Sequence, residues 1–391
     1  MEETDETHIK HVPDPISTPQ GQLNPYPWYR QMREEAPVRY DSERDCWDVF
    51  GYDAVKRVAT DFETFSSEFD ATPIAGPDEE RVIDLGETMI RRDPPEHERL
   101  RGIVDEYFRP GALREFNEEF EQLTNEQLDR VLEDGESEFD FVREFASPIP
   151  SRVIAEILGV PPENQELFVK VGPGSEYSQR ELKSYITELI RERTENPTDD
   201  ILSEVIHAEP DGYKMTEEEI YQFCALLLLA GSQTTITLLT NAVWLFAEHD
   251  IVSEIRDGVI DHETAIEEVL RYRPPVHRIR RVATEAVDLD GVTIQAGDRV
   301  AAWIGSAHRD PRAFEKPATF DPSRAPNPHL AFGSGIHFCL GAPLARIEAN
   351  IVLSVFLDRV SDVRLATDDF EPIMNSTMYG LRSLPLSVRT P

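Results

Sequence analysis

Hydrophobic and polar positions along the chain follow two different periods. From about residue 95 to 270, apolar residues recur at steps of three and four, which predicts a series of amphipathic helices. Residues 276–304 change to a period near two and contain turn pairs, which indicates strands. A hairpin at 38–50, between short helices at 25–36 and 52–61, precedes the helical part. The pattern predicts one mainly α-helical domain over residues 1–391 with a small β-rich region, and a loosely ordered segment at 1–20.

The longest predicted helix, 217–249, has apolar residues on nearly all sides and therefore should cross the centre of the fold. Thr216 and Glu219 form the capping-box pattern at its start. Within it, "LLLLAGSQTT" (226–235) interrupts the leucines with Gly231 and polar residues. Glycine costs about 1 kcal/mol against alanine inside a helix. The interruption therefore indicates that the helix accommodates something at this point.

The charge of the chain is strongly acidic. Against 75 acidic residues there are 39 basic ones, of which six are lysine and 33 arginine, and the net charge is −36. A dispersed acidic surface argues against nucleic-acid binding, which needs a basic footprint. Acidic excess with scarce lysine resembles proteins of extreme halophiles, so we expect a halophilic archaeal source and a cytosol rich in salt, where counterions screen the charge. An ordinary acidic cytosolic protein is the alternative.

No targeting or membrane segment is expected. The N-terminus is acidic and lacks an apolar stretch, and the longest apolar runs are too short and interrupted to span a bilayer. We therefore expect a cytoplasmic protein. We also expect it to be a monomer. The three cysteines (46, 224 and 339) lie far apart, so neither a disulfide framework nor a zinc cluster is indicated.

Cys339 has a distinctive neighbourhood, "FGSGIHFCLG", with glycines at 333, 335 and 341. The glycines allow the backbone to fold tightly, and a predicted helix start next to the cysteine favours a thiolate. Such a thiolate suits either a nucleophile or an iron ligand.

The spacing F-x-x-G-x-x-x-C-x-G, formed by Phe332, Gly335, Cys339 and Gly341, resembles the haem-binding loop of the cytochrome P-450 family. The resemblance covers nearly the whole chain and is nearest to the soluble prokaryotic type. It implies the P-450 fold, with haem b (iron protoporphyrin IX) buried between the long central helix and the cysteine loop. Cys339 would be the axial ligand of the haem iron, with Phe332, Gly333 and Gly341 around it.

Other motifs agree with this resemblance. It implies a structural pair, Glu268 and Arg271 in "EEVLR", completed by Arg324. It also implies propionate ligands, since two carboxylates need cationic donors. The residues in these positions are His97, Arg101, Arg281 and His337.

The central helix resembles the oxygen-activating motif A-G-x-[D/E]-T-T of the family. Gly231 would let the haem and dioxygen approach the backbone, and Thr234 would help to deliver protons. Gln233 departs from the pattern, because an amide cannot titrate. Two interpretations stay open: water and Thr234 carry the protons, or the enzyme uses peroxide or performs another haem-thiolate reaction. A second departure is the segment between 166 and 185, which is shorter than the lid of relatives.

The resemblance predicts a monooxygenase that inserts one oxygen atom from O2 into a small, largely apolar substrate. Electrons would come from NAD(P)H through a separate ferredoxin reductase and ferredoxin, docked near Arg101 and Arg346. A haem-based sensor or electron carrier is the non-enzyme alternative, for which no second axial ligand is evident. Candidate substrate contacts are 69–76, Leu229, Val276, His277 and 375–379.

Overall fold

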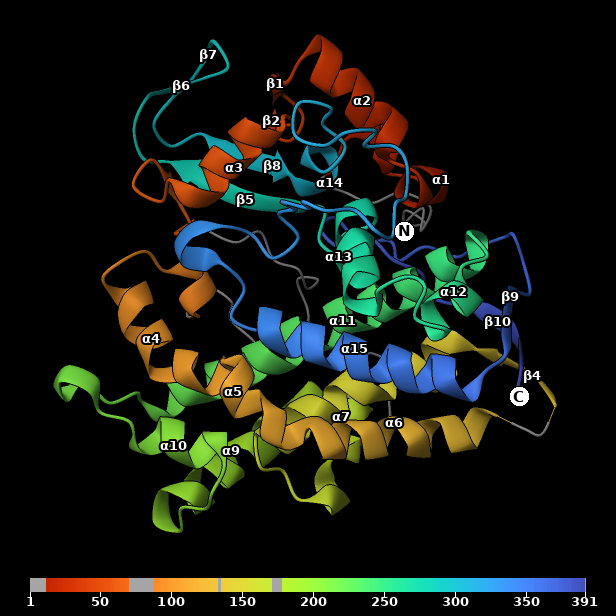
Figure 1. Ribbon diagram of the computed structural model, residues 1–391. Coiled ribbons are helices and arrows are strands. Elements are labelled where there is room, and N and C mark those ends of the chain that lie inside the picture. The colour runs from red at the N-terminus through yellow and green to blue at the C-terminus, as the bar shows by residue number, and fades with distance from the viewer. Residues whose placement is uncertain (1–11, 70–87, 133–134, 171–177, 391) are drawn as a thin grey trace, which may run out of the picture.

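A helical layer makes up most of the molecule (Figure 1). The computed structural model describes residues 12–69, 88–132, 135–170 and 178–390. The helices of this layer are α4 (Glu96–Val104), α5 (Pro110–Leu113), α6 (Asn117–Val131), α7 (Pro148–Ile157), α8 (Glu166–Val169), α9 (Gln179–Glu195), α10 (Ile201–His207), α11 (Glu217–Glu248), α12 (Val252–Arg256), α13 (His262–Tyr272) and α15 (Ala342–Arg359). The upper part of the molecule in Figure 1 contains α1 (Pro19–Leu23), α2 (Tyr26–Glu35), α3 (Tyr52–Thr60) and α14 (Ile304–Ala307).

Helix α11 runs through the middle of this layer and packs against α7, α9, α13 and α15. The Thr216 hydroxyl accepts a hydrogen bond from the Glu219 N–H, and the Glu219 carboxylate accepts one from the Thr216 N–H, so the predicted capping box is present. Three glutamates in the first turn also complement the helix dipole. The helix is continuous through "LLLLAGSQTT", so that sequence interrupts the burial of the helix and not its backbone.

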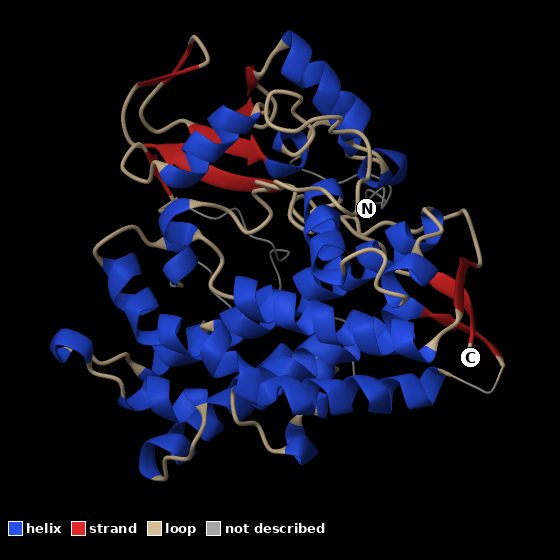
Figure 2. Cartoon of the chain, viewed as in Figure 1, coloured by secondary structure: helices blue, strands red, loops and turns tan. Residues whose placement is uncertain are grey.

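Most of the strands, shown in red in Figure 2, form a second, smaller region above the helices, and the others lie at the right-hand edge of the helical layer. The main sheet has the order β1-β2-β8-β5-β3, and its strands are β1 (Val38–Asp41), β2 (Cys46–Val49), β3 (Phe65–Ser66), β5 (Arg278–Ala283) and β8 (Arg299–Trp303). The predicted hairpin is the antiparallel pair β1 and β2. A hairpin of β6 (Val287–Leu289) and β7 (Val292–Ile294) and a three-stranded sheet of β4 (Glu136–Asp140), β10 (Pro385–Arg389) and β9 (Asp362–Leu365) complete the β structure. The architecture is thus mainly helical with a small β-rich region, as the sequence predicted.

Two expectations need correction. Residues 1–11 lie outside the described part, but 14–16 and 19–23 form short helices and Ile16 is fully buried, so residues 12–20 are not loosely ordered. Two helical stretches, Glu217–Glu248 and Gly335–Arg359, are long and apolar enough to cross a membrane, contrary to the estimate from the sequence. For Glu217–Glu248 the apolar composition has another cause, since 67% of its most apolar window is buried inside the protein.

Candidate functional site

The loop before α15 turns tightly around Cys339. Gly333 and Gly335 have φ values of 72° and 73°, a region that favours glycine. A Cβ atom on Gly335 would lie 2.9 Å from the Cα of Thr60, so the loop also packs closely on α3. The Cys339 N–H donates to the Phe332 carbonyl over 2.9 Å, which ties the two ends of the motif together.

The Cys339 side chain is accessible to solvent although protein atoms surround it on most sides, as expected for a group on the wall of an internal hollow. Burial raises the pKa of its thiol, whereas the backbone N–H of Gly341, the guanidinium groups of Arg101 and Arg346 and the backbone N–H of Ala342 lower it. Burial prevails, although the N–H groups at the helix start act in the direction that the sequence predicted. A metal ion bound to sulfur would deprotonate it.

Helix α11 has a second accessible stretch. Its residues 220–228 and 235–246 are buried, but Leu229 and Ala230 are exposed and residues 231–234 are partly exposed. Leu229 is 47% exposed in the middle of a core helix, which is unusual for a large apolar side chain. This stretch therefore borders space that a large group can fill.

The polar residues of this stretch differ in their hydrogen bonds. The Thr234 hydroxyl donates to the Ala230 carbonyl over 2.7 Å, so its oxygen is left to accept a hydrogen bond from another group. Gln233 has no hydrogen bond to any described residue, and its amide is free for a ligand or water.

Gly231 allows a close approach to α11, and the neighbour that approaches it in the structure is another helix, α7. A Cβ atom there would lie 2.9 Å from Cδ1 of Ile154 in α7. The missing side chain thus allows α7 to pack against α11, and any role beside the haem stays a prediction.

Five basic side chains from three segments lie together, and we call them the cationic cluster: Arg91, His97, Arg101, Arg281 and His337. The ring centroids of His97 and His337 are 4.4 Å apart. Burial, followed by the nearby Arg281, His97, Arg101 and Arg91, lowers the pKa of His337 to about 3. Arg91 was missed in the sequence, because only the fold brings it to the others.

The cationic cluster has too little negative charge around it. Two carboxylates lie near it. Asp105 Oδ1 lies 3.4 Å from Arg101 Nε, and Asp93 Oδ1 lies 3.9 Å from His337 Nε2, while Asp93 already accepts hydrogen bonds from Ser66 and Ser67. His97 Nδ1, His337 Nε2 and Arg91 Nε are buried without partners. Burial lowers the pKa of both Arg91 and Arg281 to about 10. A dianion such as a pair of haem propionates satisfies this set of donors.

Arg101 connects the cluster to the cysteine loop. Its Nη1 donates to the carbonyl oxygens of Ile336 (3.2 Å) and Phe338 (2.6 Å), the residues on either side of His337. Together, the accessible thiol, the accessible stretch of α11 and the unpaired donors fit a haem group. Within the described residues no group of three or more His, Cys, Asp or Glu is suited to a metal ion.

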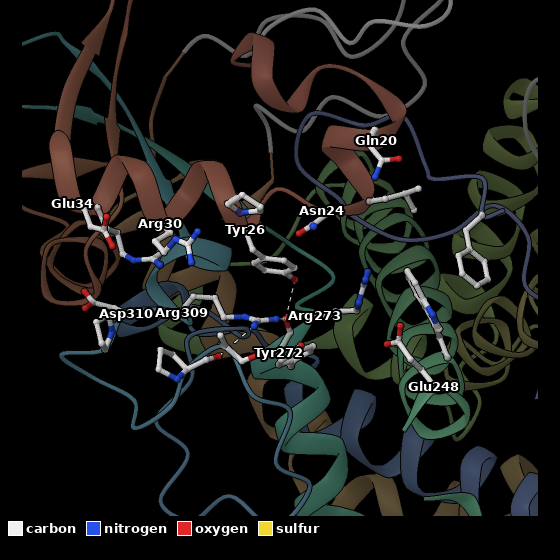
Figure 3. A pocket seen from close by; sticks show the side chains of 18 of the residues that line it. Gln20, Asn24, Tyr26, Arg30, Glu34, Glu248, Tyr272, Arg273, Arg309 and Asp310 are labelled. Atoms are coloured by element: carbon white, nitrogen blue, oxygen red, sulfur yellow. Dashed lines mark hydrogen bonds between the residues drawn. The ribbon is translucent and has the colours of Figure 1, made fainter. Parts of the chain in front are cut away.

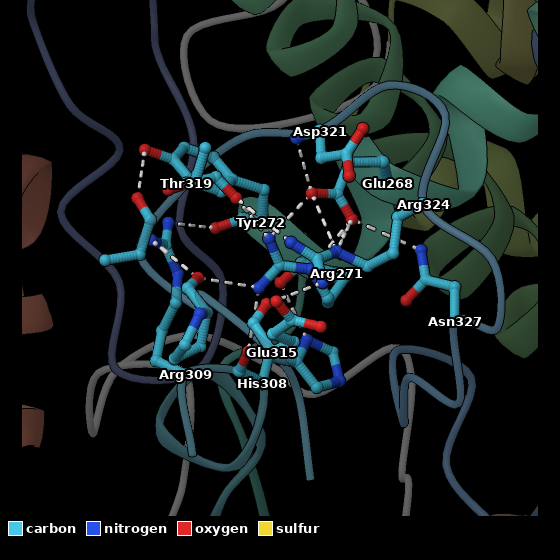
Figure 4. Close-up of polar contacts among 12 residues, drawn as sticks. Glu268, Arg271, Tyr272, His308, Arg309, Glu315, Thr319, Asp321, Arg324 and Asn327 are labelled. Carbon is cyan, nitrogen blue, oxygen red and sulfur yellow. Dashed lines mark hydrogen bonds and ion pairs between the residues drawn. The ribbon is translucent and has the colours of Figure 1, made fainter. Parts of the chain in front are cut away.

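A separate buried network of polar side chains connects α13 with residues of the segment 308–327 (Figure 4). Glu268 and Arg271 are fully buried and joined by two hydrogen bonds of 2.7 Å. The Arg324 Nε also donates to Glu268, at 3.0 and 3.2 Å. Arg271 in turn donates to the backbone carbonyls of three residues: His308, Pro317 and Thr319. The network joins α13 to the segment that leads to the cysteine loop.

The predicted substrate contacts are only partly described. His277 is buried, stacks on Tyr379 at 3.9 Å between ring centroids and bonds with the Tyr29 hydroxyl, so it belongs to the core and not to an open pocket wall. Residues 70–76 and the lid segment 171–177 lie outside the described residues.

Comparison with known proteins agrees with this geometry. The family model described as "Cytochrome P450" matches residues 262–389. Cytochrome P450 109 of Bacillus spizizenii is 37% identical over 395 residues, which cover 95% of this chain and 94% of the relative. The polyketide biosynthesis cytochrome P450 PksS of Bacillus subtilis is 34% identical over 393 residues, or 93% of this chain and 96% of the relative.

Solved structures give the same result. The crystal structure of substrate-free CYP109E1 from Bacillus megaterium has a TM-score of 0.85 and 38% identity, covering 94% of this chain and 99% of that one. The complex of CYP109E1 with testosterone has a TM-score of 0.83, 38% identity and the same coverage of both chains. The chain therefore belongs to the cytochrome P450 family. It has the fold of that family, is an oxygen-incorporating oxidoreductase and uses haem as its cofactor.

Proposed function

We propose that the protein inserts one oxygen atom from O2 into a small, largely apolar organic substrate. The observation that carries this proposal is the accessible stretch 229–234 in an otherwise buried α11, with the Thr234 hydroxyl oxygen free to accept. The testosterone named in the structure of a relative is a small, largely apolar molecule, which supports the substrate class. Membership of an enzyme family also argues against a sensor or an electron carrier.

In this proposal Cys339 would hold the haem iron through its sulfur, beside Phe332, Gly333 and Gly341, and the cationic cluster would hold the haem propionates. The haem activates dioxygen when it receives electrons. Glu268, Arg271 and Arg324 fix the position of the segment before the cysteine loop, so the pocket is formed before substrate enters.

Proton delivery is the part of the proposed reaction in which this chain departs from the family's motif. A water that donates to Thr234 Oγ1 can pass a proton toward the haem, and the Gln233 amide can orient that water by donating and accepting at once. Because Gln233 cannot release a proton, the proton must come through a chain of waters. The same residue favours the alternative, a reaction driven by peroxide, which already carries the protons that O2 reduction requires.

Electrons would come from NAD(P)H through a separate ferredoxin reductase and ferredoxin. The proposed docking contacts differ in their freedom to bind a partner. Arg346 is held by Glu267 at 2.6 Å and lies over the Phe332 ring at 4.4 Å, so its charge is partly compensated. Arg101 is directed at the cysteine loop by its two carbonyl acceptors. Reversal of charge at Arg346 with no change in reduction rate would count against docking at that residue.

The proposal extends to the cell in which the protein works. A net charge of −36 suits a cytoplasm rich in potassium salt, in which counterions screen the repulsion between carboxylates. We further propose a cytoplasmic monomer that binds neither membrane nor nucleic acid. The relatives named above come from Bacillus species, so they give no support to an archaeal origin, and the salt proposal rests on charge alone.

Turnover of a probe steroid with isotopic oxygen tests this function. With a surrogate ferredoxin, its reductase, NADPH and ¹⁸O2, we expect product carrying one ¹⁸O atom and no product without the reductase. A product that forms with hydrogen peroxide but never with NADPH and O2 would replace the proposal with the peroxide alternative.

A further inference from the structure

A pocket of about 870 Å³ lies apart from the cysteine loop (Figure 3). It is open to solvent and is lined by α1 and α2, the C-terminal ends of α11 and α13, and the segments 309–312, 317–318 and 368–370. Trp244, which lines it, follows Thr234 by ten residues in α11, a separation of about 15 Å along the helix at 1.5 Å per residue. The pocket is therefore distinct from the proposed oxygen site.

Arg273 is the residue of this pocket that lacks a partner. Its side chain makes no hydrogen bond or ion pair with any described residue, and its Nε is buried without an acceptor. The guanidinium carbon lies 3.7 Å from the centroid of the Trp244 ring. Burial lowers the pKa of Arg273. Stacking on an indole offsets only part of the cost of burying a cation, so an anion at this point would be stabilising.

The other internal arginines of the pocket have structural partners. Arg309 lies between the rings of Tyr26 and Tyr272, at 4.1 and 3.6 Å from their centroids, and donates to the Tyr272 carbonyl over 2.8 Å. Arg33 donates from its Nη1 to the carbonyl and hydroxyl oxygens of Ser306, both over 2.9 Å. The exposed Arg312 forms an ion pair of 2.7 Å with Asp310. These contacts make one wall of the pocket rigid and leave the Arg273 guanidinium as its unmatched internal cation.

The surroundings of Arg273 limit the chemistry of a ligand. In Figure 3 its guanidinium extends toward the side where Gln20 and Asn24 lie, and both amides line the pocket. Phe370 also lines the pocket, with its ring centroid 4.8 Å from that of Trp244. Exposed Glu248 lines the same pocket and would repel an anion of high charge. A single carboxylate matches one guanidinium in bidentate geometry, and an apolar body matches the aromatic wall.

We propose that this pocket is a second ligand site, which binds a small organic monocarboxylate through Arg273 with its apolar body against Trp244 and Phe370. The site does not depend on the proposed monooxygenase reaction. Because Trp244 belongs to α11, a bound carboxylate contacts the helix that also carries the accessible stretch 229–234.

Calorimetric titration of the haem-loaded protein with phenylacetate, at constant ionic strength, tests the proposal. We expect saturable binding that Arg273→Gln weakens by about 10-fold to 100-fold, the range for a lost hydrogen bond between charged groups. Arg30→Gln is the matched control, because Arg30 also lines the pocket but is exposed. The affinity of this variant for phenylacetate should stay within about twofold of the wild-type affinity. Benzyl alcohol, which lacks the carboxylate, should not bind in the same range.

Further measurements keep each outcome decisive. The absorption spectrum of each variant verifies that haem is bound, and Arg273→Lys, which keeps the charge but loses the planar fork, should give intermediate affinity. Equal affinity of the wild type and Arg273→Gln for phenylacetate would overturn the proposal, and so would the absence of saturable binding to the wild type. Equal competition by chloride and by acetate would reduce the site to one for inorganic anions and would also overturn it.

Discussion

Replacement of Glu268 by glutamine tests the buried network most sharply. The substitution keeps the shape of the side chain and removes its charge. In the wild type the Glu268 carboxylate accepts two hydrogen bonds of 2.7 Å from Arg271, and both side chains are fully buried. It also accepts from the Arg324 Nε and, over 2.8 Å, from the backbone N–H of Asp321. A glutamine amide would direct N–H groups at some of these donors and leave Arg271 as a buried cation without a counter-charge.

The size of the effect follows from burial. Removal of one partner of a buried ion pair costs about 3–5 kcal/mol. Arg271 keeps three carbonyl acceptors in the variant, so we expect a loss near the lower end, about 3 kcal/mol. A typical domain is stable by only about 5–15 kcal/mol, so the loss is a large fraction of the total.

Glu267→Gln provides the matched control one residue away. Glu267 binds Arg346 at 2.6 Å and His329 at 2.8 Å. Burial raises the pKa of the Glu267 carboxyl, but the bonds to Arg346 and His329 outweigh burial and lower this pKa to about 2. Its side chain is 29% exposed and that of Arg346 is 36% exposed, so water screens the pair and we expect a loss of about 1 kcal/mol or less. Urea unfolding followed by circular dichroism at fixed salt measures both variants. A loss for Glu268→Gln no greater than that for Glu267→Gln would refute the reasoning.

Three further predictions address protonation and salt. Burial raises the pKa of Glu348 to about 8 from its ordinary value of 4.5. The folded protein therefore keeps a proton that the unfolded chain releases, and stability falls as pH rises from about 4.5 to 8. Glu348→Gln should therefore gain stability over the wild type between about pH 4.5 and 8, by up to about 3 kcal/mol at pH 7, and a difference that is constant with pH would contradict this. Gln233→Glu should raise NAD(P)H-coupled turnover if proton delivery limits the rate, whereas no change or a fall would indicate another proton route or another reaction. With a net charge of −36, the urea midpoint should rise between about 0.1 M and 2 M KCl, and a midpoint independent of salt would argue against a high-salt habitat.

Features with a local cause could be predicted from the sequence. Helix α11 and its capping box depend on residues within four positions of each other. The hairpin of β1 and β2 also pairs residues that are close in the sequence, from Asp41 with Cys46 to Val38 with Val49. The cysteine loop was found because its glycines and cysteine have a specific spacing, and the structure gives Gly333 and Gly335 the positive φ values that this spacing implies.

Features that depend on distant segments could not be predicted. Strand β4 ends at Asp140 and pairs with β10, which begins only at Pro385, so its five residues gave no usable local pattern. Arg91 joins the cationic cluster only through the fold, and the neighbour that Gly231 accommodates, Ile154, belongs to another helix. The helix start lowers the pKa of Cys339 as the sequence indicated, but burial, which a sequence does not show, is the larger effect and raises it.

The central claim is that Cys339 binds the haem iron through its sulfur. Its most direct test is the absorption spectrum of the reduced, CO-bound protein in concentrated KCl. The account predicts the red-shifted Soret band of thiolate ligation in the wild type and its loss in Cys339→Ser. A Soret band at the normal position in the wild type, or a red-shifted band that persists in Cys339→Ser, would contradict it.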